Sequence, residues 1–205
     1  MVLDNVGNLY GTTSQGGDFE DSACITVSYG CGEVFKLDPA GHLIGGYAFI
    51  GDEWEGGWPR SAVTLDAAGN VYGTNAGGGF PNWVCGGQGC GVLFEVDQYG
   101  FYGVLYHFTG WVDGGVPYGN VIFDAVGNLY GTTEGGGAFR KGVVFKLDPR
   151  GVYTVLHSFN GTDGAYPYAG LVLDTDGNLY GTTAEGGKLS ACPGGCGVVF
   201  KITMH

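Results

Sequence analysis

One short segment occurs four times in this 205-residue chain, and it restricts the possible folds more than any other feature. It reads Gly-Asn-Leu-Tyr-Gly-Thr-Thr, with small variations, at residues 7–13, 69–75, 127–133 and 177–183. The asparagines of successive copies are 62, 58 and 50 positions apart. A regular recurrence at this spacing is typical of repeat architectures, in which each repeat is one supersecondary unit.

Three further segments complete the repeat. An apolar run precedes the Gly-Asn segment at residues 63–66, 121–124 and 171–174, and the chain begins inside such a run at residues 1–4. A Val-Phe-Lys segment follows at residues 33–38, 92–97, 143–148 and 198–202, and a last segment occurs only three times, ending at residues 48–49, 107–108 and 158–159. All are short, rich in β-branched and aromatic residues, and bounded by Asp and Gly, which is typical of strands joined by tight hairpins.

These strands predict an all-β fold: a β-propeller built from four repeats of four-stranded antiparallel blades, with strands A to D in chain order. The last blade lacks its own D strand. We expect a single domain, 1–205, with repeats at approximately 1–58, 59–116, 117–166 and 167–205. The incomplete blade leaves three alternatives: a ring closed by four blades, a homo-oligomer formed through the unpaired edge, or a fragment of a longer protein.

The amount of glycine would by itself suggest disorder, because glycine accounts for 44 residues. The hydrophobic content of 44% argues against that reading, since disordered chains lack the apolar residues to form a core. Many glycines also recur at the same places in every repeat. They are expected at turns and at close approaches between backbones and side chains.

The consensus runs Leu-x-x-Asp-x-x-Gly-Asn-Leu-Tyr-Gly-Thr-Thr, Gly-Gly, Gly-x-Val-Phe-Lys-Leu-Asp, Val-Leu-His-Ser-Phe and Asp-Gly-x-x-Pro. It resembles the GloVer-type tandem repeat of bacterial secreted or surface-anchored proteins, over essentially the whole chain and most closely at residues 127–183. The resemblance implies an extracellular repeat protein and carries over no catalytic residues. The first D strand, at residues 42–50, departs from the Val-Leu-His-Ser-Phe pattern.

The six cysteines form three local pairs: Cys24 with Cys31, Cys85 with Cys90, and Cys192 with Cys196. Neither Cys-x-x-Cys spacing nor interspersed histidines are present, so the pairs favour disulfides over zinc. Three disulfides indicate an oxidising compartment. We therefore expect a secreted or cell-surface protein, with no export signal in this chain.

The net charge of −12 disfavours nucleic-acid or anionic-membrane partners, which require clustered Lys and Arg. No apolar run is long enough for a membrane span. Residues 174–178 resemble half of a calcium loop, but the sister turns lack the second Asp. We expect these aspartates to cap turns, and we expect no metal or cofactor.

Residues present in every repeat are expected to serve the fold, and residues that break the pattern are candidates for function. The breakers gather in the B–C loops and the D–A connections, which emerge on one face of a propeller; we call this the loop face. The opposite, tight-turn face is expected to offer no distinctive chemistry. All four tryptophans are expected in loops. The predicted ligand-binding residues are aromatic: Trp54, Trp58, Trp83, Trp111, Tyr118, Tyr166 and Tyr168.

Aromatic rings and carboxylates together suit a carbohydrate or another small polar ligand. A secreted carbohydrate-binding module is therefore the first hypothesis, and a purely structural surface repeat is the third. The second is a glycoside hydrolase, which needs a pair of carboxylates at a defined separation as acid and base or nucleophile. The candidate carboxylates on the loop face are Glu134, Glu185, Asp113, Asp163, Glu53 and Glu55.

Overall fold

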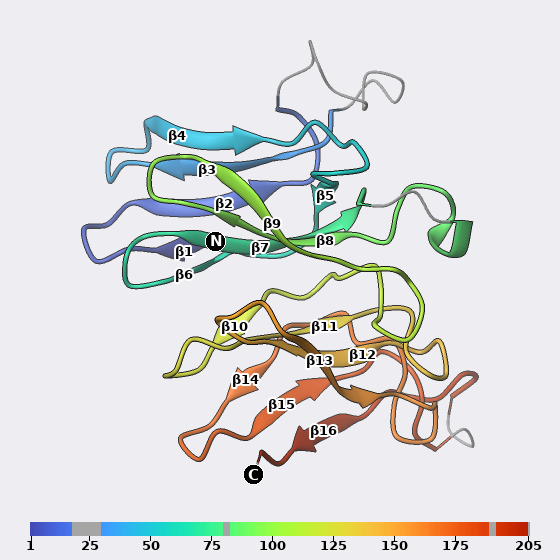
Figure 1. Cartoon of the computed structure of the whole chain (residues 1–205). Helices are drawn as coiled ribbons and strands as arrows, with labels where there is room; N and C mark the ends of the chain where they lie inside the picture. The colour runs from blue at the N-terminus through green and yellow to red at the C-terminus, as the bar shows by residue number, and fades with distance from the viewer. Residues whose placement is uncertain (18–29, 80–82, 189–191, 205) are drawn as a thin grey trace. The chain divides into compact units, whose positions relative to one another are not determined.

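The structure is a computed structural model that describes residues 1–17, 30–79, 83–188 and 192–204. In the described part of the chain, the regular elements are β-strands and one short 3₁₀ turn, η2 (Trp83–Cys85). The chain divides into two compact units, Met1–His107 and Phe108–His205. Each unit contains two antiparallel sheets (Figure 1).

Unit 1 contains a four-stranded and a five-stranded sheet. The first has the order β1 (Val2–Leu3), β2 (Leu9–Thr13), β3 (Glu33–Leu37) and β4 (Leu43–Ala48). In the second, β7 (Val71–Gly77) pairs with β8 (Val92–Val96), which pairs with β9 (Tyr102–His107), and β7 also pairs with both β5 (Gly57–Pro59) and β6 (Thr64–Leu65). The strand order of a propeller blade is therefore confirmed in both sheets, while β5 is an additional strand that the repeat pattern did not predict.

Unit 2 contains a four-stranded and a three-stranded sheet. The first has the order β10 (Ile122–Phe123), β11 (Leu129–Thr133), β12 (Val143–Leu147) and β13 (Tyr153–Ser158). The second has the order β14 (Val172–Leu173), β15 (Leu179–Thr182) and β16 (Val199–Ile202). The last sheet lacks an outer strand within the described residues, as the repeat count predicted.

The same contact between a glycine and the ring of a phenylalanine in the neighbouring strand occurs in more than one sheet. Gly73 pairs with Phe94 across β7 and β8, and a Cβ on Gly73 would lie 2.6 Å from Cζ of the ring. Gly131 and Phe145 repeat this arrangement at 2.6 Å. Both rings are 0% exposed. The glycine of Tyr-Gly-Thr is thus required because the core phenylalanine occupies the volume of its missing side chain.

The aspartate before each Gly-Asn segment holds the A–B turn. Oδ1 of Asp174 accepts hydrogen bonds from the backbone N–H groups of Asp176 (3.0 Å) and Asn178 (2.8 Å). Its Oδ2 accepts from Nδ2 of Asn178 (2.9 Å) and from the hydroxyl of Tyr180 (2.9 Å). The hydrogen bond from the Asn178 side chain is the main cause that lowers the pKa of Asp174, to about 2. These bonds confirm the prediction that the repeated aspartates and tyrosines serve the fold.

The residue before the proline of each D–A connection has a left-handed backbone. Trp58, Val116 and Tyr166 have φ angles of 58°, 56° and 55°. This conformation is unfavourable for bulky side chains, and for a β-branched residue such as Val116 in particular. Hydrogen bonds to the connection hold its backbone in this conformation. In unit 2, the carbonyl of Val116 accepts a hydrogen bond from the N–H of Glu134.

Candidate functional site: a tyrosine and carboxylate cluster

Two tyrosines of unit 2 meet on its loop face. Tyr118 and Tyr168 each follow the proline of a D–A connection, and their rings are in edge-to-face contact with centroids 5.4 Å apart. The hydroxyl of Tyr168 donates a hydrogen bond of 2.9 Å to Oε1 of Glu134. The two tyrosines are 50 residues apart in the sequence, and the strand pairing of two neighbouring sheets brings them together.

Backbone pairing fixes the two glutamates beside these tyrosines. Glu134 directly follows β11, and its N–H donates to the carbonyl of Val116 (3.1 Å). Glu185 pairs with Ala165 through two backbone hydrogen bonds of 2.8 and 3.0 Å. Each glutamate is therefore attached to a D–A connection.

Both glutamates contribute to the raised pKa of the Tyr168 hydroxyl. The hydrogen bond to Glu134 is the main cause that raises the pKa of Tyr168, to about 12, and burial, the charge of Glu134, Tyr118 and the charge of Glu185 also contribute. A phenol in this state stays protonated at neutral pH and donates to the carboxylate. Tyr168 is 46% exposed, so its ring remains open to solvent. Aromatic surface, a hydroxyl and two carboxylates thus lie in one accessible place.

Asp113 and Asp163 have side-chain contacts in their own D–A connection or with the strand before it, whereas Glu55 contacts β9 through its backbone carbonyl. Both oxygens of Asp113 accept hydrogen bonds from Thr109, and Asp113 is only 8% exposed. Asp163 accepts from the N–H of Asn160 (2.9 Å) and lies 3.0 Å from Nε2 of His157. The backbone carbonyl of Glu55 accepts a hydrogen bond from the hydroxyl of Tyr102. In unit 2, the backbone carbonyl of Asp113 accepts the corresponding hydrogen bond from the hydroxyl of Tyr153. These contacts hold the D–A connections in shape.

Glu53 lies in a different place from the cluster. It is exposed and lines a small pocket of unit 1, about 130 Å³ in volume, together with Asp52 and Trp58. The cluster thus contains two of the six carboxylates proposed from the sequence, Glu134 and Glu185.

The tryptophans differ in their surroundings. Trp54, Trp83 and Trp111 are 58%, 77% and 44% exposed, and the guanidinium of Arg140 lies 5.4 Å from the ring centroid of Trp111. Trp58 is different, because it lies in β5 and packs against the hydrophobic core of unit 1. The expectation that every tryptophan lies in a loop was therefore wrong for Trp58. Its strand, β5, pairs with the end of β7, which extends beyond the repeat segment at residues 69–75.

The remaining predicted aromatic residue, Tyr166, is half-buried, and the ammonium group of Lys141 lies 5.5 Å from its ring centroid. The N–H of Tyr166 donates to the carbonyl of Lys141 (2.9 Å). This hydrogen bond thus holds the D–A connection in place, two residues before Tyr168.

Two of the three predicted disulfides are present, Cys85–Cys90 and Cys192–Cys196. Cys24 lies outside the described residues, as do Phe19, Glu20, Asp21 and Tyr29 of the same loop. The disulfides indicate that the protein forms in an oxidising, extracytoplasmic compartment.

Neither a metal site nor a membrane-spanning helix is present among the residues that the structure describes. No group of three or more His, Cys, Asp or Glu side chains is placed to hold a metal ion. No helix in the same residues is long and apolar enough to cross a membrane.

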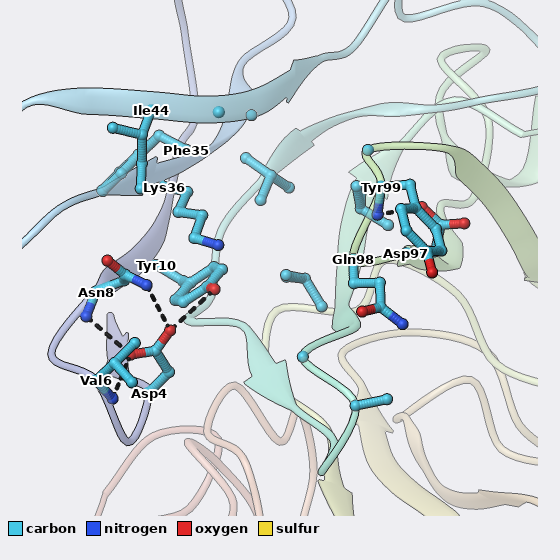
Figure 2. Close-up of a pocket in the computed structure, with 18 residues that line it drawn as sticks. Asp4, Val6, Asn8, Tyr10, Phe35, Lys36, Ile44, Asp97, Gln98 and Tyr99 are labelled. Carbon is cyan, nitrogen blue, oxygen red and sulfur yellow. Dashed lines mark hydrogen bonds between the residues drawn. The ribbon is translucent and has the colours of Figure 1, made fainter.

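Sequence reasoning missed a pocket on the tight-turn face of unit 1. It has a volume of about 510 Å³ and lies between the sheet β1–β4 and the sheet β6–β9. Figure 2 shows Lys36 and Tyr10 on one wall and Gln98 and Tyr99 on the other. The signal was present in the sequence, because the turn at residues 97–100 has Gln98-Tyr99 where the corresponding turns have Pro39-Ala40 and Pro149-Arg150.

Comparison with known proteins identifies a family. The model of the Gloeobacter/Verrucomicrobia repeat matches residues 1–200, which confirms the resemblance derived from the repeats. No curated protein matches this chain.

Two solved structures are similar to the chain. One is the extracellular domain of a hybrid two-component system protein from B. thetaiotaomicron, at 17% identity and a TM-score of 0.45 over 73% of this chain. The other is a candidate gluconolactonase, at 18% identity and a TM-score of 0.45 over 77% of this chain. The chain spans 18% and 52% of their respective lengths.

Proposed function

This chain belongs to the Gloeobacter/Verrucomicrobia repeat family, and we propose that it binds a carbohydrate-type ligand at the cluster of Tyr118, Tyr168, Glu134 and Glu185. The observation that carries the proposal is the contact between residues of neighbouring repeats: the rings of Tyr118 and Tyr168 meet edge to face, and the Tyr168 hydroxyl donates to Glu134. The proposed setting is extracellular, in agreement with the disulfides.

The chemistry of the cluster fits a hydroxyl-rich ring. Tyrosine combines a flat apolar face with a polar tip, so it can contact the C–H face of a sugar and still form hydrogen bonds. Carboxylate oxygens accept from sugar hydroxyls, and charge-assisted hydrogen bonds of this kind are the stronger ones. A carboxylate pair also disfavours anionic ligands. Neutral sugars are therefore the preferred class.

Two substitutions separate the contributions of ring and charge. Tyr168→Ala removes the aromatic surface, and Glu134→Gln removes the charge but keeps the shape. We expect each to weaken binding at least about tenfold, since a hydrogen bond to a charged group contributes about 1.5–3 kcal/mol. Phe139→Ala is the matched control, because Phe139 is an exposed aromatic residue (58%) of the same unit outside the cluster.

The measurement is a glycan-array screen followed by isothermal titration calorimetry with the best glycan. Affinity that drops in both cluster variants and stays unchanged in Phe139→Ala supports the site. Binding of equal strength in all four proteins, or no binding to any glycan, contradicts it. In the second case the purely structural repeat becomes the better description.

A glycoside hydrolase is the second candidate, and it has one specific observation in its favour. Glu134 accepts the hydrogen bond from the Tyr168 hydroxyl, and the charge of Glu185 contributes to the raised pKa of the same hydroxyl. A catalytic acid usually sits in apolar surroundings, whereas Glu185 is exposed; this favours binding over hydrolysis.

Chromogenic glycosides test the enzyme hypothesis directly. Turnover by the wild type that is lost in both Glu134→Gln and Glu185→Gln would support hydrolysis. Absence of turnover across a panel of α- and β-linked substrates, in a protein that binds the same sugars, would leave binding as the function.

A further inference from the structure

A pocket in unit 1 combines several residues that break the repeat pattern. It opens on the tight-turn face and is lined by both sheets of the unit. Its residues are separate from the cluster around Tyr168, which lies in the other unit. A glycine in β4 leaves space in the pocket, and a departure from the repeat lies in the turn that follows β8.

The space in the pocket comes from Gly45 in β4. Gly45 pairs with Lys36, and the ammonium group of Lys36 lies over the ring of Tyr10, so these three residues share the face of the sheet that lines the pocket. Phe35 alternates with Lys36 along β3 and pairs with Gly11, so its ring lies on the opposite face. A Cβ on Gly45 would meet no atom within 4 Å. Gly45 therefore leaves space beside Lys36 and Tyr10.

The departure from the repeat is Gln98 in the turn between β8 and β9. In two sister turns a proline packs on the glycine of the A–B turn: a Cβ on Gly7 would lie 3.4 Å from Cγ of Pro39, and Gly127 faces Pro149 at the same distance. Gln98 takes the place of this proline, and a Cβ on Gly69 meets nothing within 4 Å.

The backbone of this turn remains anchored. The N–H of Gln98 donates to Oδ1 of Asn70 (3.0 Å), a bond that proline cannot form. Its side chain and that of Tyr99, which is 78% exposed, line the pocket (Figure 2).

The remaining polar groups of the pocket are mostly occupied. Asp4 accepts four hydrogen bonds from Val6, Asn8 and Tyr10, and Oδ1 of Asp97 accepts from two backbone N–H groups. Among the described residues Lys36 forms no ion pair, and its ammonium group lies 5.1 Å from the ring centroid of Tyr10. The groups open to a ligand are thus two donors, Lys36 and Gln98, beside aromatic rings.

We propose that this pocket is a second ligand site, which takes a neutral, hydroxylated ring of monosaccharide to disaccharide size. Tyr10 and Tyr99 line the pocket and provide aromatic surface for the apolar face of such a ring, and Lys36 and Gln98 donate to its oxygens. The charges of Asp4 and Asp97 outnumber that of Lys36 and disfavour an anionic ligand. The ligand class rests on the proposed function, while the site itself rests on separate residues.

The test fills the pocket without disturbing the fold. Gly45→Val places a β-branched side chain at a strand position with open space, so the protein should fold normally. Gly103→Val is the matched control, because Gly103 has the same place in β9 opposite Glu95 that Gly45 has in β4 opposite Lys36, and its Cβ also meets nothing within 4 Å. Gln98→Pro restores the residue of the sister turns and removes the amide.

The probes are methyl glycosides of glucose, galactose, mannose and xylose, and cellobiose, titrated into ¹⁵N-labelled protein and followed by NMR. We expect shifts of the Gln98 and Tyr99 amides in the wild type and in Gly103→Val. Gly45→Val and Gln98→Pro should weaken this response at least about tenfold, and in Gln98→Pro it is followed at the Tyr99 amide, because proline has no N–H. Equal responses in Gly45→Val and Gly103→Val, or no response at these amides to any probe, overturn the proposal.

The same titration separates this site from the proposed function. Shifts confined to residues around Tyr168 would leave the first site standing and overturn the second. Shifts at Tyr99 that persist in Tyr168→Ala would support the second site by itself, and shifts at Tyr99 with none around Tyr168 would contradict the first.

Discussion

Val199 in β16 is 80% exposed, whereas Val144, at the corresponding position of β12, is 0% exposed. The two valines pair with equivalent threonines, Thr182 and Thr132, so their places in the sheets are the same. Val144 packs against Leu171 and Leu179 of the sheet that follows it, whereas β16 belongs to the last described sheet, and no described strand pairs with its outer edge. An unpaired edge with exposed apolar residues is a template for another strand.

We predict that this edge drives self-association. The wild type should elute with a mass above that of one chain in size-exclusion chromatography with light scattering, and Val199→Lys should shift it to the monomer. Val126→Lys is the control, because Val126 is equally exposed (75%) but lies in a turn of the same unit. A wild type that is monomeric at all concentrations contradicts the prediction.

Gly73→Ala is predicted to destabilise the protein by about 1–3 kcal/mol, because the added methyl group would overlap the buried ring of Phe94. Gly103→Ala in the same sheet adds a methyl group in open space and should have little effect. Chemical denaturation of both variants measures the difference. Equal stability of the two variants would falsify the packing described for the repeated glycine.

Asp174 should contribute to stability in a pH-dependent way. Its folded pKa of about 2 lies below the ordinary value of 3.8, so its contribution is complete above about pH 4 and is lost as the pH falls toward 2. Asp174→Asn is therefore expected to lower stability at pH 7 and to flatten its dependence between pH 4 and 2. Thermal unfolding across this range tests it.

Asp176→Asn serves as the control for that experiment. Asp176 lies in the same turn and is exposed, and its backbone N–H, rather than its carboxylate, contacts Asp174. A pH profile that changes as much in Asp176→Asn as in Asp174→Asn would show that the hydrogen bonds of Asp174 are not the cause.

Val116→Asn is predicted to raise stability by up to about 1 kcal/mol. Val116 has a φ of 56°, a conformation that asparagine tolerates far better than a β-branched residue. The same substitution at Val126, which does not have a left-handed backbone, should bring no gain. A melting temperature that falls in Val116→Asn would indicate that the side-chain contacts of Val116 outweigh its backbone strain.

Local chemistry made much of this structure predictable. Asp174 and Tyr180 are six residues apart in one hairpin, and Cys85 and Cys90 lie in one loop, so chain proximity already brings each pair together. The strands and the incomplete last sheet follow from short patterns that each repeat contains in full. Such features depend on the backbone conformation of a few successive residues, which the sequence encodes directly.

Contacts between sheets decided the rest. Glu134 and Asp113 are both candidate carboxylates of the loop face, yet Glu134 contacts Tyr168 from the next repeat while Asp113 contacts Thr109 in its own loop. In the same way, Gly45 and Gln98 line one pocket although 53 positions separate them. Which pattern-breaking residues become neighbours depends on strand register and on the packing of one sheet against the next. Those distances are set by the folded core, and no spacing along the chain contains them.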